Sequence, residues 1–489
     1  MIQILADALP ILLLLVLTMA TFAGFPISFT LGGASVIFAG VGILTGSFEA
    51  ALLLSLPSRI FGAITNEVLV AIPLFLFMGH VLERAGLAED LVVSLSALLG
   101  GRAGGLGVTT VIVGALLAGT TGVVASDVVA LGLIALPTML RSGYRDDFAC
   151  GIVCSSATLA QIIPPATVLI IIADTLSTAN QRAQVELGNF APASVTISDV
   201  YAGALIPGLL LTALYIAYVC GRAWLKPTDA PPAAAIRRAS LIDIARALLP
   251  TLALVGMVLG SLLAGVATAT ESASLGAVGA LVLAVYRGKF SAGLIRHVMS
   301  TTARGTSMIF MIFIAASTFA LVFRGLGGET MIENALRDLP GGLAMAMLVT
   351  MALIFVLGCF LDTFEIVFIV VPLFAPPLIK LGADPVWLAV MIGLNLQTSF
   401  IMPPHGYTLA YLRSVAPDSV PTKAIWRGVL PFVAIQLVAL MLVGLMPWLA
   451  TALPDRIYDA TAPLPARPPF TTLPRTGEPL QPLDLIKPN

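Results

Sequence analysis

Charged residues are scarce in this sequence: Asp, Glu, Lys and Arg make up 10% of its 489 residues, whereas 58% are hydrophobic. A soluble domain of this length could neither bury nor solvate so much apolar surface, so the composition is typical of a polytopic membrane protein. The formal net charge of -1 excludes a basic nucleic-acid-binding surface. Because lipid offers no hydrogen-bond partners, open sheets are excluded and the apolar runs are predicted to be helices.

Residues that build catalytic and metal centres are also few. The sequence has three histidines and four cysteines, and it lacks an HExxH motif or any paired cysteines. The cysteines lie in apolar stretches and are interpreted as packing residues. A membrane-embedded enzyme would need a clustered nucleophile, base or metal set, so we do not expect enzymatic activity.

Apolar segments cover most of the chain up to residue 451. Ten have the length of a single span: 4–23, 26–46, 66–84, 148–176, 200–224, 246–266, 269–286, 304–323, 386–412 and 428–451. Two others, 104–140 and 342–381, are too long for one span, and each has a polar interruption midway. Each is either two full helices or one re-entrant hairpin. Since each half has only about 14–18 residues, length favours the hairpin.

The distribution of Lys and Arg supports this interpretation. With both long segments as hairpins, sixteen basic residues fall on one face of the membrane and five on the other. The richer face is predicted to be cytoplasmic. The five opposite residues are Arg59, Arg182, Arg324, Arg337 and Lys380. The first hairpin then opens to the cytoplasm and the second to the outer side, so the two are inverted.

The two halves also resemble each other in sequence. Gly104-Gly105-Leu106 corresponds to Gly341-Gly342-Leu343, Leu136-Pro137 to Val371-Pro372, and Pro164-Pro165 to Pro403-Pro404. Repeated sequence with opposite orientation is typical of inverted-repeat transporters, whose binding site lies near the midplane where interrupted helices meet. The expected fold is therefore an all-α polytopic membrane protein with inverted repeats, two re-entrant helical hairpins and two broken helices.

Oxygen-bearing residues concentrate at the two hairpin tips. Thr120, Thr121 and Gly122 form the first tip, and Ser126 with Asp127 is expected to cap the half-helix that follows. The second tip has Gly358, Asp362 and Thr363 in the equivalent places. Hydroxyls, carbonyls and an occasional carboxylate are the ligands of alkali cations, so both tips are candidate cation sites.

The broken partner helices add further polar groups. Ser155 and Ser156 precede Ile163-Pro164-Pro165, and Gln397, Thr398 and Ser399 precede Met402-Pro403-Pro404-His405. Proline cannot donate a hydrogen bond, so the carbonyls before it are freed from the helical ladder. The simpler alternative is that these hydroxyls bond within their own helices, that Pro-Pro only kinks them, and that Asp127 only caps.

At these residues the chain resembles the large membrane (M) subunit of tripartite ATP-independent periplasmic (TRAP) transporters, in the ion-transporter superfamily. The matching motifs are Ala71-Ile72-Pro73-Leu74-Phe75, Gly119-Thr120-Thr121-Gly122, Arg141-Ser142-Gly143-Tyr144, Ile163-Pro164-Pro165, Thr270-Glu271-Ser272-Ala273, Leu361-Asp362, Asp384-Pro385-Val386-Trp387 and Pro403-Pro404. The resemblance implies an elevator-type sodium symporter in the bacterial inner membrane. It also implies two partners, a small four-helix membrane (Q) subunit and a periplasmic substrate-binding (P) protein.

The resemblance also implies where ligands bind. Sodium site 1 would use Thr120, Thr121, Gly122, Ser155, Ser156 and Ile163; sodium site 2 would use Gly358, Asp362, Thr363, Thr398 and Met402; substrate would contact Ser126, Asp127, Pro165, Gln397, Ser399, Pro404 and His405. The first tip departs from the commoner Gly-Ser-Ser pattern of the family, although hydroxyl ligation survives the change. The expected substrate is a small carboxylate, such as a C4-dicarboxylate or 2-oxo acid. A stand-alone ion-coupled symporter or antiporter of the same superfamily is the alternative.

These expectations divide the chain into six parts. They are N-terminal scaffold helices (1–103), the first half of the transport domain (104–176), scaffold and connecting helices (177–340), the second half of the transport domain (341–412), the last membrane helix (413–451) and a Pro-rich tail expected to be disordered (452–489).

Overall fold

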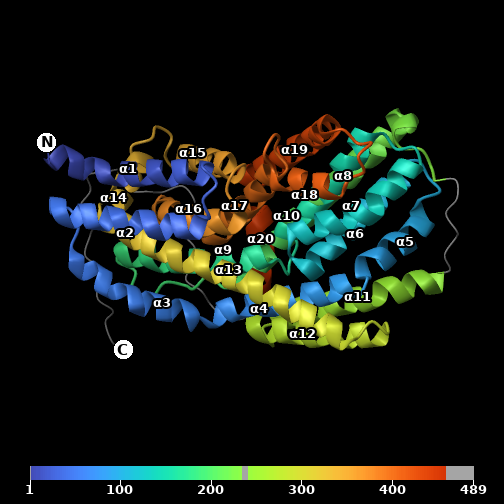
Figure 1. Ribbon diagram of the computed structural model, residues 1–489, viewed down its shortest axis with the longest axis horizontal. Helices are drawn as coiled ribbons and strands as arrows, with labels where there is room; N and C mark the ends of the chain where they lie inside the picture. Colours follow the sequence, from blue (N-terminus) through green and yellow to red (C-terminus); the bar gives the residue numbers. More distant parts are fainter. Residues whose placement is uncertain (1, 234–240, 459–489) are drawn as a thin grey trace, which may run out of the picture.

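The computed structural model describes residues 2–233 and 241–458, and this part of the chain is helical throughout, without strands (Figure 1). The elements are α1 (Ile2–Phe22), α2 (Ile27–Thr45), η1 (Ala50–Ser55), α3 (Leu56–Ile64), α4 (Glu67–Arg84), α5 (Leu87–Leu99), α6 (Gly105–Thr121), α7 (Val124–Arg141), α8 (Asp146–Thr158), η2 (Leu159–Gln161), α9 (Thr167–Glu186), α10 (Ile197–Leu225), η3 (Pro227–Asp229), α11 (Leu241–Leu263), α12 (Ala269–Tyr286), α13 (Ala292–Gly325), α14 (Gly328–Arg337), α15 (Gly342–Gly358), α16 (Thr363–Lys380), α17 (Pro385–Phe400), α18 (Tyr407–Val415), α19 (Thr422–Leu445) and α20 (Trp448–Tyr458).

Several of these helices can cross a bilayer. Within the described residues, eight are long and apolar enough to do so, or nine if the bent pair of η1–α3 with α4 counts as one span. In that pair the axis turns by 48° at the break. With every backbone group bonded inside a helix, such segments satisfy the requirement of a hydrocarbon solvent. The predicted polytopic all-α fold is therefore confirmed for the described residues.

Both overlong segments divide into two helices at the predicted places. α6 ends at Thr121 and α7 begins at Val124, with Gly122 between them at φ +61°, a left-handed conformation that favours glycine. α15 ends at Gly358 and α16 begins at Thr363. The helices of each pair contact each other. The first pair (teal) lies in the right half of Figure 1 and the second (orange) in the left half. Their re-entrant insertion stays a prediction, because α7 and α16 are each long enough to span alone.

Two other helices break at proline pairs, as the sequence predicts. α8 and η2 end at Gln161, and α9 begins after Pro164-Pro165. α17 ends at Phe400, and α18 begins after Pro403-Pro404. Both Pro–Pro peptide bonds are cis. A proline ring cannot donate to the helical ladder, which accounts for the interruption at both sites.

The core of the molecule lies around α8 and α17. Every residue of α17 from Val386 to Phe400 is buried, and so is every residue of α8 from Phe148 to Thr158. α8 packs against α6, α7 and α19, whereas α17 packs against α15, α19 and α9. The polar side chains carried by these two helices are therefore enclosed by protein.

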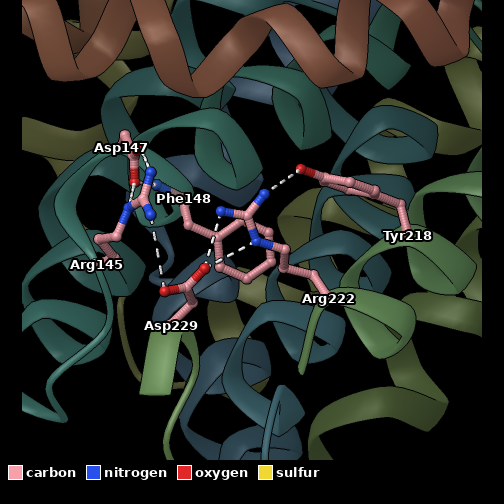
Figure 2. Close-up of polar contacts among 6 residues, drawn as sticks. All are labelled: Arg145, Asp147, Phe148, Tyr218, Arg222 and Asp229. Carbon is pink, nitrogen blue, oxygen red and sulfur yellow. Dashed lines mark hydrogen bonds and ion pairs between the residues drawn. The ribbon is translucent and has the colours of Figure 1, made fainter. Parts of the chain in front are cut away.

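A cluster of charges ties the start of α8 to the end of α10. Figure 2 shows its members: Arg145, Asp147, Phe148, Tyr218, Arg222 and Asp229. Asp229 accepts a 2.8 Å hydrogen bond from Arg222 Nε, and one of its carboxylate oxygens lies 3.8 Å from the Arg145 guanidinium. Arg145 also donates to both carboxylate oxygens of Asp147. The hydrogen bond from Arg145 lowers the pKa of Asp147, against the opposing effect of burial. Arg145 and Arg222 are among the sixteen basic residues predicted to lie on the cytoplasmic face.

The predicted tail begins too early. Residues 452–458 belong to α20, which packs against α10, and Ala450 is completely buried there. Packing on α10 stabilises this helix. The two helices approach closely at Gly203, where an added Cβ would lie 2.7 Å from the Ala450 carbonyl. The remainder of the predicted disordered tail, 459–489, lies outside the described residues.

Candidate functional site

The first tip contains a buried hydroxyl–carboxylate pair. The Thr121 hydroxyl donates a 2.7 Å hydrogen bond to Asp127 Oδ1, and both side chains are at most 5% exposed. The second carboxylate oxygen, Asp127 Oδ2, is buried and has no hydrogen-bond partner among the described residues. Since a lone buried carboxylate oxygen costs several kcal/mol, this atom calls for a cation or a proton.

Asp127 does not cap its helix. Val123 is the N-cap of α7, and Ser126 and Asp127 follow within the first turn, so the predicted capping role is wrong. The extended Val123 shifts the helix start upstream, which leaves the Asp127 carboxylate free to turn back to Thr121. The sequence assigned Asp127 to substrate and Thr121 to sodium, whereas the structure joins the two residues in one cluster.

The first tip rests on the break between α8 and α9. The Gly122 carbonyl accepts a 3.0 Å hydrogen bond from the Thr167 hydroxyl, and a Cβ on Gly122 would lie 3.4 Å from the carbonyl of the buried Pro165. The neighbouring Gly119 would similarly place a Cβ 3.5 Å from the Pro164 carbonyl. The structure thus brings the tip close to the carbonyls of Pro164 and Pro165, which follow Ile163 directly in the sequence.

The hydroxyls assigned to the first sodium site differ in their hydrogen bonding. Ser156 packs against Gly114 of α6, about two helical turns from the tip, and donates to the Ile152 carbonyl at 2.6 Å. Ser155 Oγ is buried without a hydrogen-bond partner among the described residues. Thr120 donates to the Leu117 carbonyl at 2.9 Å. The simpler prediction of bonding within the helix therefore describes Ser156 and Thr120, but not Ser155. The Thr121 hydroxyl lies within hydrogen-bond distance of both the Leu117 carbonyl of its own helix, at 3.0 Å, and Asp127.

The second tip is packed against α17. A Cβ on Gly358 would lie only 2.1 Å from Ser399 Oγ, so glycine permits the closest approach of α15 to α17. Thr398 and Ser399 each donate to a carbonyl of their own helix at 2.7 Å. The Met402 carbonyl accepts a 2.9 Å bond from Gly406 N–H, which leaves it one lone pair.

The start of α16 completes this tip. Asp362 is its N-cap and is half-buried, and its N–H donates to Glu365 at 3.0 Å. The Thr363 hydroxyl does not reach α17. It accepts a 2.8 Å hydrogen bond from the Gln161 amide, which belongs to the break of the other half. The two halves of the protein are therefore bonded directly to each other, the break of the first half to the tip of the second.

Several buried side-chain amides in this region have atoms without a hydrogen-bond partner among the described residues. Gln397 is fully buried, and neither its oxygen nor its nitrogen has a hydrogen-bond partner among the described residues. The side-chain oxygens of Gln161 and Asn395 are unpartnered as well. Most buried polar atoms in proteins are hydrogen-bonded, so these unpartnered amide atoms make the region a candidate ligand site. Amide oxygens accept cations, and amide N–H groups donate to carboxylates.

His405 and Pro404 lie at the accessible edge of the second break. Both are exposed, and the His405 ring lies 5.3 Å from the Phe360 ring, centroid to centroid. The adjacent Tyr407 donates a 2.9 Å hydrogen bond to the Phe360 carbonyl. These contacts place His405 beside the second tip, where the sequence predicted a substrate-facing residue.

One polar residue of the buried interior was missed. Gln436 of α19 donates to the Tyr215 hydroxyl at 2.6 Å and to the Thr158 hydroxyl at 3.2 Å. It thereby ties the end of α8 to α10 and α19. The available signal was a lone amide within the apolar run 428–451, because such groups in membrane helices are costly unless they bond to a neighbour.

Comparison with known proteins agrees with this architecture. The family model described as "Tripartite ATP-independent periplasmic transporter, DctM component" matches residues 12–449. The C4-dicarboxylate TRAP transporter large permease protein DctM of Pseudomonas aeruginosa is 30% identical over 403 residues, covering 82% of this chain and 89% of that protein. The sialic acid TRAP transporter large permease protein SiaM of Vibrio cholerae is 27% identical, covering 89% of this chain and 96% of that protein.

Solved transporters share the fold. The YdaH transporter of Alcanivorax borkumensis aligns with a TM-score of 0.59 at 17% identity, covering 83% of this chain and 89% of the other. MtrF of Neisseria gonorrhoeae aligns with a TM-score of 0.58 at 12% identity, covering 80% and 83%. These two similarities concern the fold alone. Since the family model covers most of its length, the chain belongs to the DctM family of large permease components of tripartite ATP-independent periplasmic transporters.

Proposed function

We propose that this large permease imports a small carboxylate and is driven by a sodium gradient. The observation that carries the proposal is the Thr121–Asp127 pair, with Asp127 Oδ2 buried and unpartnered at the first tip. A sodium ion there would neutralise the carboxylate and take oxygen ligands from the tip and from the carbonyls around Pro164-Pro165. The second tip, with Asp362 and the Met402 carbonyl, offers a second set of oxygen ligands.

The substrate would bind between the two sodium sites. Gln397 supplies a buried amide N–H for a carboxylate, and His405 stands at the accessible edge. No Lys or Arg is among the buried residues of the described chain, so a negative group would rely on amide and helix-terminal N–H donors. Relatives carry names that specify C4-dicarboxylates, sialic acid, ectoine and isethionate, and most of these are small organic anions.

Transport would require two partners and a moving domain. The family name describes a tripartite periplasmic system, which supports a small membrane subunit and a periplasmic binding protein beside this chain. In the proposed mechanism, sodium orders both tips, the binding protein releases the carboxylate between them, and the body carrying both hairpins and both broken helices slides inward as an elevator.

Sodium-dependent uptake tests this proposal. In proteoliposomes containing the permease, its small subunit and its binding protein, Thr121→Ala or Asp362→Ala should lower sodium-driven succinate uptake at least about tenfold, the equivalent of one lost ligand contact of about 1.4 kcal/mol. Each variant removes an oxygen ligand from one tip. Radiolabelled succinate is followed with and without an inward sodium gradient.

Matched variants control for folding. Thr138→Ala removes a hydroxyl that bonds to the Ile134 carbonyl within the same helix pair, and Asp338→Ala removes an exposed carboxylate. Both should transport like the unmodified protein. Unchanged sodium stimulation in Thr121→Ala and Asp362→Ala together would reject the sodium assignment.

A further inference from the structure

A polar cavity lies outside the two tips. It has a volume of about 310 Å³ and is lined by residues of α3, α9, α13 and α16 and by Asn66, the residue before α4. Three arginines line it, Arg59 from α3, Arg182 from α9 and Arg324 from α13. None of the residues assigned to the two sodium sites or to the substrate is part of its lining, although α9 belongs to the first broken helix and α16 to the second predicted hairpin.

The charges of this cavity are not balanced. Arg182 and Arg324 share a single carboxylate, Glu329, each at 2.7 Å. Arg59 has no ion pair or hydrogen bond with any described residue, and it is exposed. The one acidic residue in the lining, Asp174, already accepts a 3.0 Å hydrogen bond from Asn66. Three guanidinium groups thus face two carboxylates, and one positive charge is left over.

The Glu329 contact also leaves hydrogen-bonding capacity unused. Arg324 Nε lies 2.7 Å from a Glu329 oxygen and is buried against it, whereas no hydrogen bond joins the terminal nitrogens of Arg324 to a described residue. A guanidinium carries five N–H donors in a planar fork that matches the two oxygens of a carboxylate. An anion between Arg59 and Arg324 would therefore gain donors that the protein itself does not satisfy.

The remaining walls define the size and polarity of the ligand. Phe313 and Phe368 form an apolar wall, with ring centroids 4.9 Å apart in an edge-to-face arrangement. Small-molecule sites occupy roughly 300–1,000 Å³, so this cavity suits a ligand at the small end of that range. A carboxylate on a short carbon chain fits both the guanidinium side and the phenyl side.

We propose that this cavity is a separate binding site for a small carboxylate, held by Arg59, Arg182 and Arg324. The distribution of basic residues predicts that all three arginines lie toward the outer face. This role rests on the proposed import of carboxylates. The site would be an entry site, at which the anion binds before it reaches the tips. Arg59 is its least constrained and most accessible donor.

Thermal melting of the purified full-length protein tests for the site. Potassium succinate should raise the melting temperature relative to potassium chloride of equal ionic strength, because a ligand that binds only the folded state stabilises it. The neutral analogue succinamide should not. Arg59→Gln should weaken the apparent succinate affinity at least about tenfold. This substitution breaks no ion pair, so the protein is expected to fold.

Two further variants locate the response. Arg337→Gln removes an exposed guanidinium on the same predicted face, outside the cavity, and should leave the succinate response intact. Thr138→Ala removes a hydroxyl that bonds within its own helix, outside the cavity, and should also leave it intact. The proposal is overturned if the unmodified protein shows no response, if Arg59→Gln responds fully, or if Arg337→Gln loses the response to the same extent as Arg59→Gln. Because sodium is absent, these outcomes are independent of sodium-driven uptake, which tests the proposed function.

Discussion

Gly358 is the residue on which the second tip depends most directly. Its Cα faces Ser399 at a distance that leaves no room for a methyl group, since a Cβ would fall 2.1 Å from Oγ and 2.7 Å from Cβ of that serine. A helix end that must pack this closely on another helix accepts only glycine. The position of the tip relative to α17 is thus fixed by the absence of a side chain.

Gly358→Ala should therefore displace the tip. We expect sodium-driven succinate uptake to fall at least about tenfold, while the protein still inserts and folds. Adding Ser399→Ala removes the nearest atom and should restore part of the uptake, as a double-mutant cycle would reveal. Gly260→Ala is the control, because a Cβ there meets nothing within 4 Å. Equal uptake by Gly358→Ala and the control would show that the tip tolerates a wider spacing.

Among the elements, α8 is anchored at its first turn by the charge cluster of Figure 2. The Arg145 guanidinium holds the pKa of Asp147 below its usual value of 3.8. A group whose pKa is lowered by folding stabilises the folded state above its unfolded pKa, and this contribution is lost as the pH falls through the folded pKa. The anchor should therefore weaken only in acid, below about pH 4.

Asp147→Asn tests the anchor. At neutral pH the variant should melt at a lower temperature than the unmodified protein, and the difference should shrink as the pH falls below about 4. Asp146→Asn is the matched control, since the neighbouring Asp146 is exposed and makes no ion pair with the described residues. A constant difference between Asp147→Asn and the unmodified protein across this range would contradict the assignment.

The boundaries of elements were predictable wherever the chain itself forces a break. Gly122 and the pairs Pro164-Pro165 and Pro403-Pro404 act through local backbone chemistry, so the sequence located these interruptions. The N-cap of α7 was not predictable in this way. Asp127 has the right residue type for a cap, but its carboxylate is drawn to the Thr121 hydroxyl across the tip. That choice depends on the approach of α6 and α7.

At the scale of the whole molecule, an ion-pair cluster joins the expected moving body to the expected scaffold, beside the apolar contact of Phe313 with Phe368. Lys380 at the end of α16 lies 3.0 Å from both carboxylate oxygens of Glu333 in α14 and also pairs with Glu186 of α9. An elevator movement of α16 past α14 would have to separate Lys380 from Glu333. These ion pairs are only partly buried, and pairs that water can reach contribute little to stability, which suits a contact that forms and breaks.

Cross-linking tests whether the two parts move. With Cys220 and Cys359 replaced by serine, Glu333→Cys and Lys380→Cys joined by a short reducible cross-linker should stop uptake, and reduction should restore it. The same linkage between Asp90→Cys and Arg287→Cys, which lie in the expected scaffold and pair at 2.5 Å, should leave uptake unchanged. Full uptake with the first pair cross-linked would mean that α14 and α16 travel together.

At this scale the sequence predicted the class of fold but not its internal contacts. Hydropathy, basic-residue placement and repeated motifs suffice for a polytopic all-α chain, because they reflect the solvent around it. The cavity lined by Arg59, Arg182 and Arg324 was not predictable, since these residues are far apart in sequence and were identified only as outer-face charges. Their convergence results from packing among α3, α9 and α13.

The hydrogen bond from Gln161 to Thr363 couples two regions that lie 202 residues apart in the sequence. One partner belongs to the break of the first half and the other to the tip of the second. Separating the two would therefore cost about 1 kcal/mol of hydrogen bonding. A displacement of the first break is thus expected to displace the second tip as well, although each half has its own loops and its own prolines.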